Sequence, residues 1–150
     1  MTQTRDPQQL AEQVRALMLE NDRATRALGM QVTAIGPGRA TLTMPVRADM
    51  LNGHATCHGG MITTLADSAF AFACNAGNEL TVASGVTIDF VAPGREGDLL
   101  TATAQEVQQA GRTGVYDVNV HNQRGELVAV FRGRSYRMKG KPAVNLPADH

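Results

Sequence analysis

The sequence has no tryptophan, few aromatic side chains and no net charge. Its 150 residues include 14 basic and 14 acidic side chains, and aromatic residues make up 4%. We expect no nucleic-acid partner, because such a partner needs a basic surface or aromatic platforms for its bases. No uncharged run approaches the roughly 20 residues that cross a bilayer, and Met1 to Asp6 is polar with no apolar segment behind it. We therefore expect a soluble, cytoplasmic protein with no membrane partner.

Cysteine is also scarce. Cys57 and Cys74 both lie in or beside an apolar segment, where reduced thiols behave as small hydrophobic side chains, so we expect no disulfide. His54, Cys57 and His58 do not supply the four ligands of a structural zinc site, and we expect no metal. A thiol nucleophile at Cys57 is disfavoured, because neighbours in sequence point apart and no third group that would orient His58 is visible.

Length and composition fit a single domain over residues 1–150, with 43% hydrophobic residues available for its core. Asp6-Pro7 predicts the start of an amphipathic helix. Its apolar stripe consists of Leu10, Val14, Leu17 and Met18. A short helical turn over residues 23–28 follows and ends at Gly29. Residues 1–5 and 141–150 are expected to be flexible tails.

The rest of the chain predicts one long helix and six strands. The strands are expected over residues 30–35, 40–46, 80–91, 99–109, 115–122 and 127–138. In the fifth strand, Tyr116, Val118 and Val120 alternate with polar residues, which indicates an antiparallel sheet with one buried face. The order α-β-β-α-β-β-β-β belongs to the α+β class. The long helix is apolar all round, so it needs cover that one chain has little left to supply.

The most informative segment is Cys57-His58-Gly59-Gly60, which leads into the apolar stretch Met61 to Gly77, whose only carboxylate is Asp67. An ionised group among apolar neighbours is unfavourable by several kcal/mol unless it is paired or solvated, so we expect Asp67 to be a buried acid with a functional role. Two glycines leave the first helical N–H groups uncovered by side chains, and these groups carry partial positive charge. This combination suits acyl transfer. The alternatives are close packing at the glycines and an acid that is capped or faces solvent.

Three strings around this helix carry a family resemblance: Met50-Leu51-Asn52-Gly53-His54, Cys57-His58-Gly59-Gly60, and the run from Leu65 to Asn75. Thr87-Ile88-Asp89-Phe90, Pro93-Gly94, the run from Thr113 to Asp117 and Phe131-Arg132-Gly133 extend the match. The sequence resembles the hotdog-fold acyl-CoA thioesterases of the phenylacetic acid degradation type. The resemblance implies a long central helix wrapped by a curved antiparallel sheet, in subunits that pair and then pair again. It implies hydrolysis of an acyl-CoA, such as phenylacetyl- or hydroxyphenylacetyl-CoA, with no cofactor other than the coenzyme A of the substrate.

The resemblance also implies roles for individual residues. Asp67 would act as nucleophile or as general base for water, the Gly59 N–H would polarise the thioester carbonyl, and Asn52 would help to hold the attacking water. Further candidates for substrate binding are His58, Gly60, Ser68, Thr87, Arg95 and Arg134. His58 is expected to shape the turn rather than act as a base. Apolar side chains that could line an acyl pocket are Met50, Leu51 and Phe70.

A basic cluster near the C-terminus has two interpretations. Its members are Arg132, Arg134, Arg137, Lys139 and Lys141. These side chains could protect an edge strand from aggregation, or they could meet the phosphates of coenzyme A. Arg95 belongs to the same open question.

The spacing of Gly59 and Asp67 predicts a dimer. Eight positions on one helix correspond to about 12 Å at a rise of about 1.5 Å per residue, so one carbonyl cannot reach both groups. We therefore expect Gly59 of one chain to face Asp67 of its partner. Two other functions stay open: a hotdog dehydratase that uses His58 and Asp67 on hydroxyacyl thioesters, and a protein that binds acyl-CoA without turnover.

Overall fold

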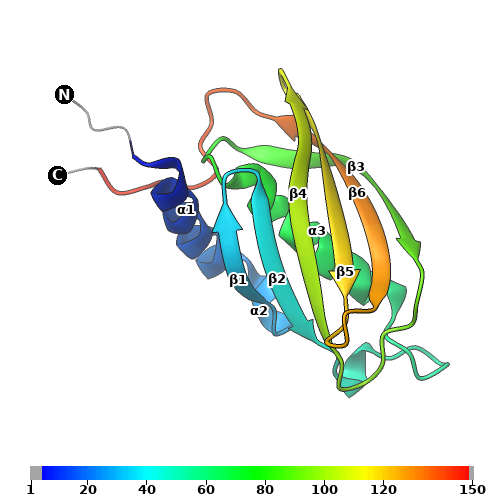
Figure 1. Cartoon of the computed structure of the whole chain (residues 1–150). Helices are drawn as coiled ribbons and strands as arrows, with labels where there is room; N and C mark the ends of the chain where they lie inside the picture. Colours follow the sequence, from blue (N-terminus) through cyan, green and yellow to red (C-terminus); the bar gives the residue numbers. More distant parts are fainter. Residues whose placement is uncertain (1–4, 149–150) are drawn as a thin grey trace.

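The structure, a computed structural model, describes residues 5–148 and follows the predicted element order (Figure 1). Helices α1 (Pro7–Asn21) and α2 (Arg23–Ala27) precede strands β1 (Gln31–Gly36) and β2 (Arg39–Pro45). The 3₁₀ turn η1 (Ala48–Met50) leads to the long helix α3 (Gly59–Asn75). The remaining strands are β3 (Thr81–Phe90), β4 (Leu99–Ala110), β5 (Thr113–His121) and β6 (Leu127–Arg137).

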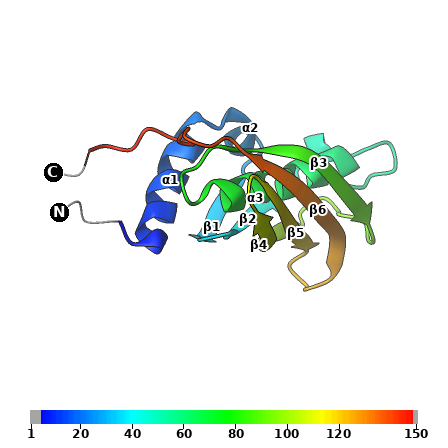
Figure 2. The ribbon, with the colours of Figure 1, turned by 90° about the horizontal axis from the view of Figure 1, so that it is seen from above.

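All six strands form one antiparallel sheet in the order β1-β2-β4-β5-β6-β3. Figure 2 shows the sheet curving around α3, while α1 lies beside the β1 edge. The opposite edge is β3, which follows α3 in the chain but pairs only with β6. A long helix inside a curved antiparallel sheet is the α+β arrangement that the hotdog resemblance implies, and this prediction is confirmed.

The N-terminal helix starts where the sequence predicts. The Asp6 carboxylate accepts a hydrogen bond from the Gln9 N–H at 3.2 Å, and Pro7 occupies the first turn, where a missing N–H does no harm. Ala11 and Val14 are the buried residues of this helix, so its inner face is centred slightly differently from the predicted stripe. Gly29 has φ +70° just after α2, a conformation in which a Cβ would be strained.

The hydrophobic core lies between α3 and the inner face of the sheet. The Phe70 ring of α3 packs at 5.5 Å from the Tyr116 ring and at 5.9 Å from the Phe131 ring. Gly133 makes room for it, because a Cβ there would lie 2.8 Å from the Phe70 ring. The predicted alternation in β5 is confirmed: Tyr116 and its inward neighbours Val118 and Val120 are all buried. Helix α3 therefore covers the middle of the sheet tightly.

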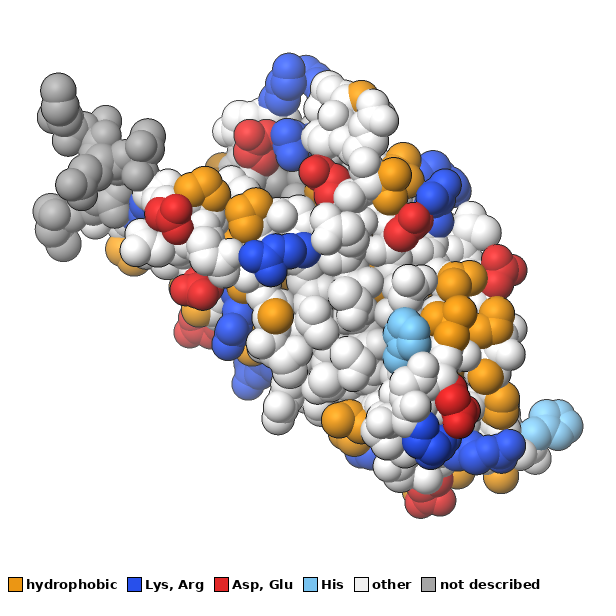
Figure 3. Space-filling model, viewed as in Figure 1, with side chains coloured by type: hydrophobic (Ala, Val, Ile, Leu, Met, Phe, Trp, Pro, Cys, Tyr) orange, Lys and Arg blue, Asp and Glu red, His pale blue; other side chains and the backbone are white. Residues whose placement is uncertain are grey.

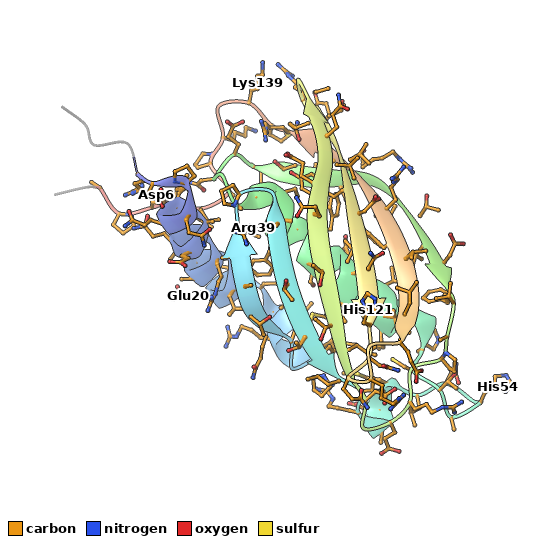
Figure 4. The ribbon with its side chains drawn as sticks, in the orientation of Figure 1. Asp6, Glu20, Arg39, His54, His121 and Lys139 are labelled. Carbon is orange, nitrogen blue, oxygen red and sulfur yellow. The ribbon has the colours of Figure 1, made fainter. Side chains whose placement is uncertain are left out.

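Strand β3 is covered far less. Val86 is 41% exposed and Phe90 is 50% exposed, although both are apolar side chains of a sheet strand. Val82 on the same strand is also exposed. Figure 3 shows hydrophobic side chains gathered beside a histidine on the sheet face, labelled His121 in Figure 4. Because β3 is an edge strand and α3 packs mainly under the centre of the sheet, both faces of β3 keep apolar surface in contact with solvent.

The segment after Gly140 crosses the end of α3. The Val144 N–H donates to Asn78 Oδ1 at 2.9 Å, and the Leu80 N–H donates to the Lys141 carbonyl at 2.8 Å. The expected flexibility of residues 1–5 and 141–150 stays a prediction, and residues 1–4 and 149–150 lie outside the described part. Within residues 5–148, no helix is both long enough and apolar enough to span a membrane.

Candidate active site

The first turn of α3 leaves one backbone donor without a partner. His58 caps the helix: its Nδ1 accepts from the Gly60 N–H at 3.2 Å, and its carbonyl accepts from the Met61 N–H at 2.9 Å. Among residues 5–148, the Gly59 N–H has no hydrogen-bond partner. The expectation that no side chain covers this turn is wrong, because the His58 ring satisfies Gly60. The expected turn-shaping role of His58 is confirmed, and it isolates Gly59 as the available donor.

Gly59 lines a surface hollow of ≈ 380 Å³. The other lining residues are Asn52, Thr56, Cys57, Ile62, Phe90, Val91, Ala92, Pro93 and Gly94. A Cβ at Gly59 would lie 2.9 Å from Cζ of Phe90, so only glycine fits here without a shift of the ring. The hollow therefore combines an unpaired N–H with mainly apolar walls, which suits the carbonyl end of an acyl group.

Asn52, which lines this hollow, uses only the oxygen of its side-chain amide for bonds within residues 5–148. Its Oδ1 accepts from the His54 N–H at 2.9 Å and from the Thr56 N–H and Oγ1 at 3.2 Å each. Its Nδ2 has no partner among the described residues. Three donors around Oδ1 fix the amide orientation, so Asn52 offers hydrogen-bond donors to a ligand. Figure 4 shows His54 at the outer tip of this loop, away from the sheet.

Asp67 does not line the hollow. It lies two turns further along α3 on the side away from the sheet. Its side chain is exposed, as is Gly60 on the same stripe, whereas Thr64 is half-buried. The expectation of an acid buried within its own chain is therefore wrong. The helical period turns its apolar neighbours Leu65 and Ala66 toward the core and Asp67 outward.

The Asp67 carboxylate makes no hydrogen bond or ion pair with any of residues 5–148. Partial desolvation on the helix surface, together with the negative charge of Asp22, raises the pKa of Asp67 above its usual value. Both effects favour the protonated form, so the acid is more basic than an ordinary surface aspartate. An unpaired, more basic carboxylate is suited to accept a proton from water.

The remaining predicted binding residues are dispersed. Ser68 is turned inward, and its Oγ lies 3.0 Å from Thr25 Oγ1. Thr87 is on the outer face of β3, in a second hollow of ≈ 330 Å³ where Arg132 binds both carboxylate oxygens of Asp117, at 2.7 and 2.9 Å. The structure thus brings Asn52, Gly59, His58 and Gly60 together, and places Asp67, Ser68 and Thr87 elsewhere.

The basic residues do not form one cluster. Arg95 directly follows Gly94 on the wall of the Gly59 hollow and is exposed. Arg134 lies against Gly85 at the bulge of β3, and Arg137 pairs with Glu79 at 3.2 Å. Of these side chains, only Arg95 stands beside the Gly59 hollow.

Sequence reasoning missed the aromatic wall of the hollow. No role in the site was predicted for Phe90, because its contact with Gly59 joins segments far apart in sequence. The sole signal was its place in the string Thr87 to Phe90. Conversely, Met50 and Phe70, expected to line an acyl pocket, are buried in the core. Within residues 5–148 no group of three or more His, Cys, Asp or Glu side chains is arranged to hold a metal ion.

Comparison with known proteins identifies the family. Residues 54–129 match the thioesterase superfamily. The acyl-coenzyme A thioesterase PaaI of Escherichia coli K12 is 52% identical over 123 residues, which are 82% of this chain and 88% of that protein. The chain belongs to the thioesterase superfamily. It is therefore a thioester hydrolase with the hotdog fold.

Solved structures of similar proteins agree with the hotdog fold. The structure of the E. coli PaaI protein from the phenylacetic acid degradation operon matches with a TM-score of 0.89 and 48% identity, covering 91% of this chain and 99% of that one. A Streptococcus mutans UA159 protein bound to acetyl CoA matches with a TM-score of 0.72 and 25% identity, covering 75% of this chain and 90% of that one.

Proposed function

We propose that this thioesterase hydrolyses aryl-acetyl-CoA thioesters, phenylacetyl-CoA or hydroxyphenylacetyl-CoA, to the free acid and coenzyme A. The observation that carries the proposal is the unpaired Gly59 N–H in the hollow that also receives the Asn52 amide. The similarity to E. coli PaaI supports the substrate class. An aryl-acetyl group is mainly apolar, and Ile62, Phe90 and Pro93 give the hollow apolar walls.

In the proposed reaction, the thioester carbonyl oxygen accepts the Gly59 N–H. The Asn52 Nδ2 donates to the same oxygen or to the attacking water. Asp67 takes a proton from that water as its oxygen attacks the carbonyl carbon, or the carboxylate attacks directly and the acyl-enzyme is then hydrolysed. Negative charge develops on the carbonyl oxygen, where the fixed N–H stabilises it. The C–S bond then breaks, and coenzyme A leaves as the thiol after protonation.

Both groups must act on one substrate, which requires two chains. Gly59 and Asp67 are about 12 Å apart along α3 by helix geometry, and Asp67 is outside the hollow. We therefore propose a homodimer in which Asp67 of each chain completes the site at Gly59 of the other. The uncovered stripe of α3 and the exposed apolar side chains of β3 support such an interface.

The proposal also covers the coenzyme A end of the substrate, the assembly of the protein and its location. Arg95, beside the hollow, is placed to meet a phosphate of coenzyme A, and Arg134 could do so only across a dimer. Pairing of dimers into a tetramer and a cytoplasmic location complete the proposal. No cofactor other than the coenzyme A of the substrate is proposed.

The test is a free-thiol release assay with phenylacetyl-CoA, hydroxyphenylacetyl-CoA and straight-chain acyl-CoAs. Asp67→Asn keeps the size of the side chain and removes the base, so we expect a loss of about 10²- to 10⁴-fold in kcat for the preferred substrate. Hydrolysis by Asp67→Asn at the parental rate would overturn the site assignment. Straight-chain substrates turned over faster than aryl-acetyl ones would overturn the substrate class.

Two outcomes would favour the other functions considered. An enoyl thioester formed from a hydroxyacyl-CoA, without thiol release, would indicate a dehydratase. Tight acyl-CoA binding without turnover would indicate a binding protein.

A further inference from the structure

A buried hydrogen-bond chain links helix α2 to the turn of α3 that carries Asp67. Asp22, between α1 and α2, accepts from the Thr25 N–H at 3.0 Å and from Thr25 Oγ1 at 2.6 Å. Thr25 Oγ1 lies 3.0 Å from Oγ of Ser68, the residue after Asp67. Thr25 is 0% exposed and Ser68 is 9% exposed. The proposed mechanism does not use any of these three residues.

The hydrogen bonds that join Ser68, Thr25 and Asp22 all run in one direction. An ionised carboxylate only accepts hydrogen bonds, so the Thr25 hydroxyl proton points to Asp22. Its oxygen can then only accept, and the Ser68 hydroxyl must be the donor. Burial excludes water as an alternative partner for Thr25, so the orientation of Ser68, and with it the backbone that carries Asp67, is set from Asp22.

Asp22 also acts on Asp67 through its charge. It is the only charged side chain among the described residues that shifts the Asp67 pKa, and it raises that pKa. The other charged groups of this corner do not pair with Asp67: Arg26 Nη1 donates to the Glu20 carbonyl at 3.0 Å, and Arg23 is exposed beside it. Among residues 5–148, no Lys or Arg side chain pairs with either of these two carboxylates.

Resting on the proposed role of Asp67, we infer that Asp22 is a positioning residue for this thioesterase: through Thr25 and Ser68 it fixes the turn that carries the base, and it holds a second negative charge beside it. Helix α2 is thereby part of the catalytic apparatus although it does not touch the Gly59 hollow. The effect is a carboxylate that stays in place and binds a proton more readily than it would alone.

The test is the pH dependence of kcat/KM in the full-length enzyme. Asp22→Asn keeps an efficient helix cap but removes the charge. The fall of kcat/KM on the acid side of the profile, the acid limb, should therefore move to lower pH. Glu20→Gln is the matched control, because it removes a nearby exposed carboxylate without such an effect on Asp67. The control should keep the parental acid limb.

The hydrogen-bond chain is tested separately. Thr25→Val preserves shape and the cap to the backbone but removes the link, so kcat should fall about three- to tenfold while KM stays near the parental value. Thr25→Ser keeps the hydroxyl that Thr25→Val removes, so its kcat should stay near the parental value. Thermal unfolding confirms that each variant is folded before its kinetics are compared.

An unmoved acid limb in Asp22→Asn, or parental kcat in a folded Thr25→Val, would overturn the inference. A uniform loss of rate in Asp22→Asn without a shift of the limb would also overturn it, because this would indicate a structural role only. These failures differ from failure of the proposed function, which would appear as full activity in Asp67→Asn.

Discussion

The two functional turns of α3 differ in how completely their own chain surrounds them. The first turn is held by contacts within its own chain: His58 caps Gly60, the Phe90 ring lies against Gly59, and Asn52 is fixed by its loop. The turn with Asp67 is open on its outer side and has no partner for the carboxylate among residues 5–148. In the proposed mechanism, one chain thus builds the half of the site that binds the carbonyl and leaves the half that holds the base without cover.

This contrast explains why one helix can carry both groups. A donor for developing charge must be rigid before the substrate arrives, and a capped helix start provides this rigidity. A base must be desolvated only when the substrate is bound, and an interface can desolvate it then. The proposed division of the site between two chains would satisfy both needs with a single sequence.

The largest effect is expected from mixing two inactive chains. Asp67→Ala has no base and Gly59→Val has a blocked hollow, so each homodimer should be inactive. A mixed dimer holds one intact site, made of Gly59 from the first chain and Asp67 from the second. Statistical mixing should therefore restore about one quarter of the parental thiol release. No recovery in a mixture shown by mass spectrometry to contain the mixed dimer would place both groups in one chain.

The second prediction tests whether a partner chain covers the turn of α3 that carries Asp67. Val86→Lys puts a charge on the exposed edge strand β3, which should prevent dimer formation and lower activity about 100-fold or more. Val107→Lys is the control, because Val107 is 54% exposed on β4, away from that edge. Sedimentation and thiol release check both variants. An active Val86→Lys monomer would show that Asp67 needs no partner.

Local sequence signals explain why the helices and strands of the fold were predictable. Asp6-Pro7 and Gly29 act within a few residues, and the alternation at Tyr116 reports a strand covered by α3. Such signals need no knowledge of distant contacts, so the element order could be derived from them before the structure. The hotdog arrangement was implied by the family resemblance.

The site was less predictable because its contacts are distant in sequence. Thr25 meets Ser68 across 43 positions, and Phe90 meets Gly59 across the sheet edge. The exposure of Asp67 was missed for a related reason. A run of apolar residues does not reveal which side of a helix the protein covers, and only the packed sheet defines that side.

The third prediction compares the neighbouring glycines Gly59 and Gly60 in the first turn of α3. Gly59→Ala brings a methyl group to 2.9 Å from the Phe90 ring, so the ring or the helix start must move. We expect a loss of about 10- to 100-fold in kcat, because the donor is displaced. In Gly60→Ala the nearest atom is His58 Nδ1 at 3.4 Å, and the rate should stay within about threefold of the parent. Equal losses in the two variants would argue against a special role for the Gly59 N–H.

The smallest effect concerns stability. The raised pKa of Asp67 means that its ionised form is less favourable in the folded than in the unfolded chain. The parent therefore loses stability as pH rises through the folded pKa, whereas Asp67→Asn does not. The variant should be slightly more stable at neutral pH, and the difference should vanish in acid, where the parental carboxyl is protonated. Urea unfolding at several pH values measures this difference.

Asp98 provides a control in which replacement of the carboxylate should lower the stability at neutral pH instead of raising it. It is 5% exposed, and although burial opposes its charge, bonds from Gln123, the Arg95 N–H and Arg124 hold its pKa below the usual value. Asp98→Asn should therefore be less stable than the parent at neutral pH, by about 1–3 kcal/mol, and approach it in acid. If both substitutions destabilised the fold alike, the Asp67 turn would be stabilised within its own chain as the first turn is, and the contrast between them would fail.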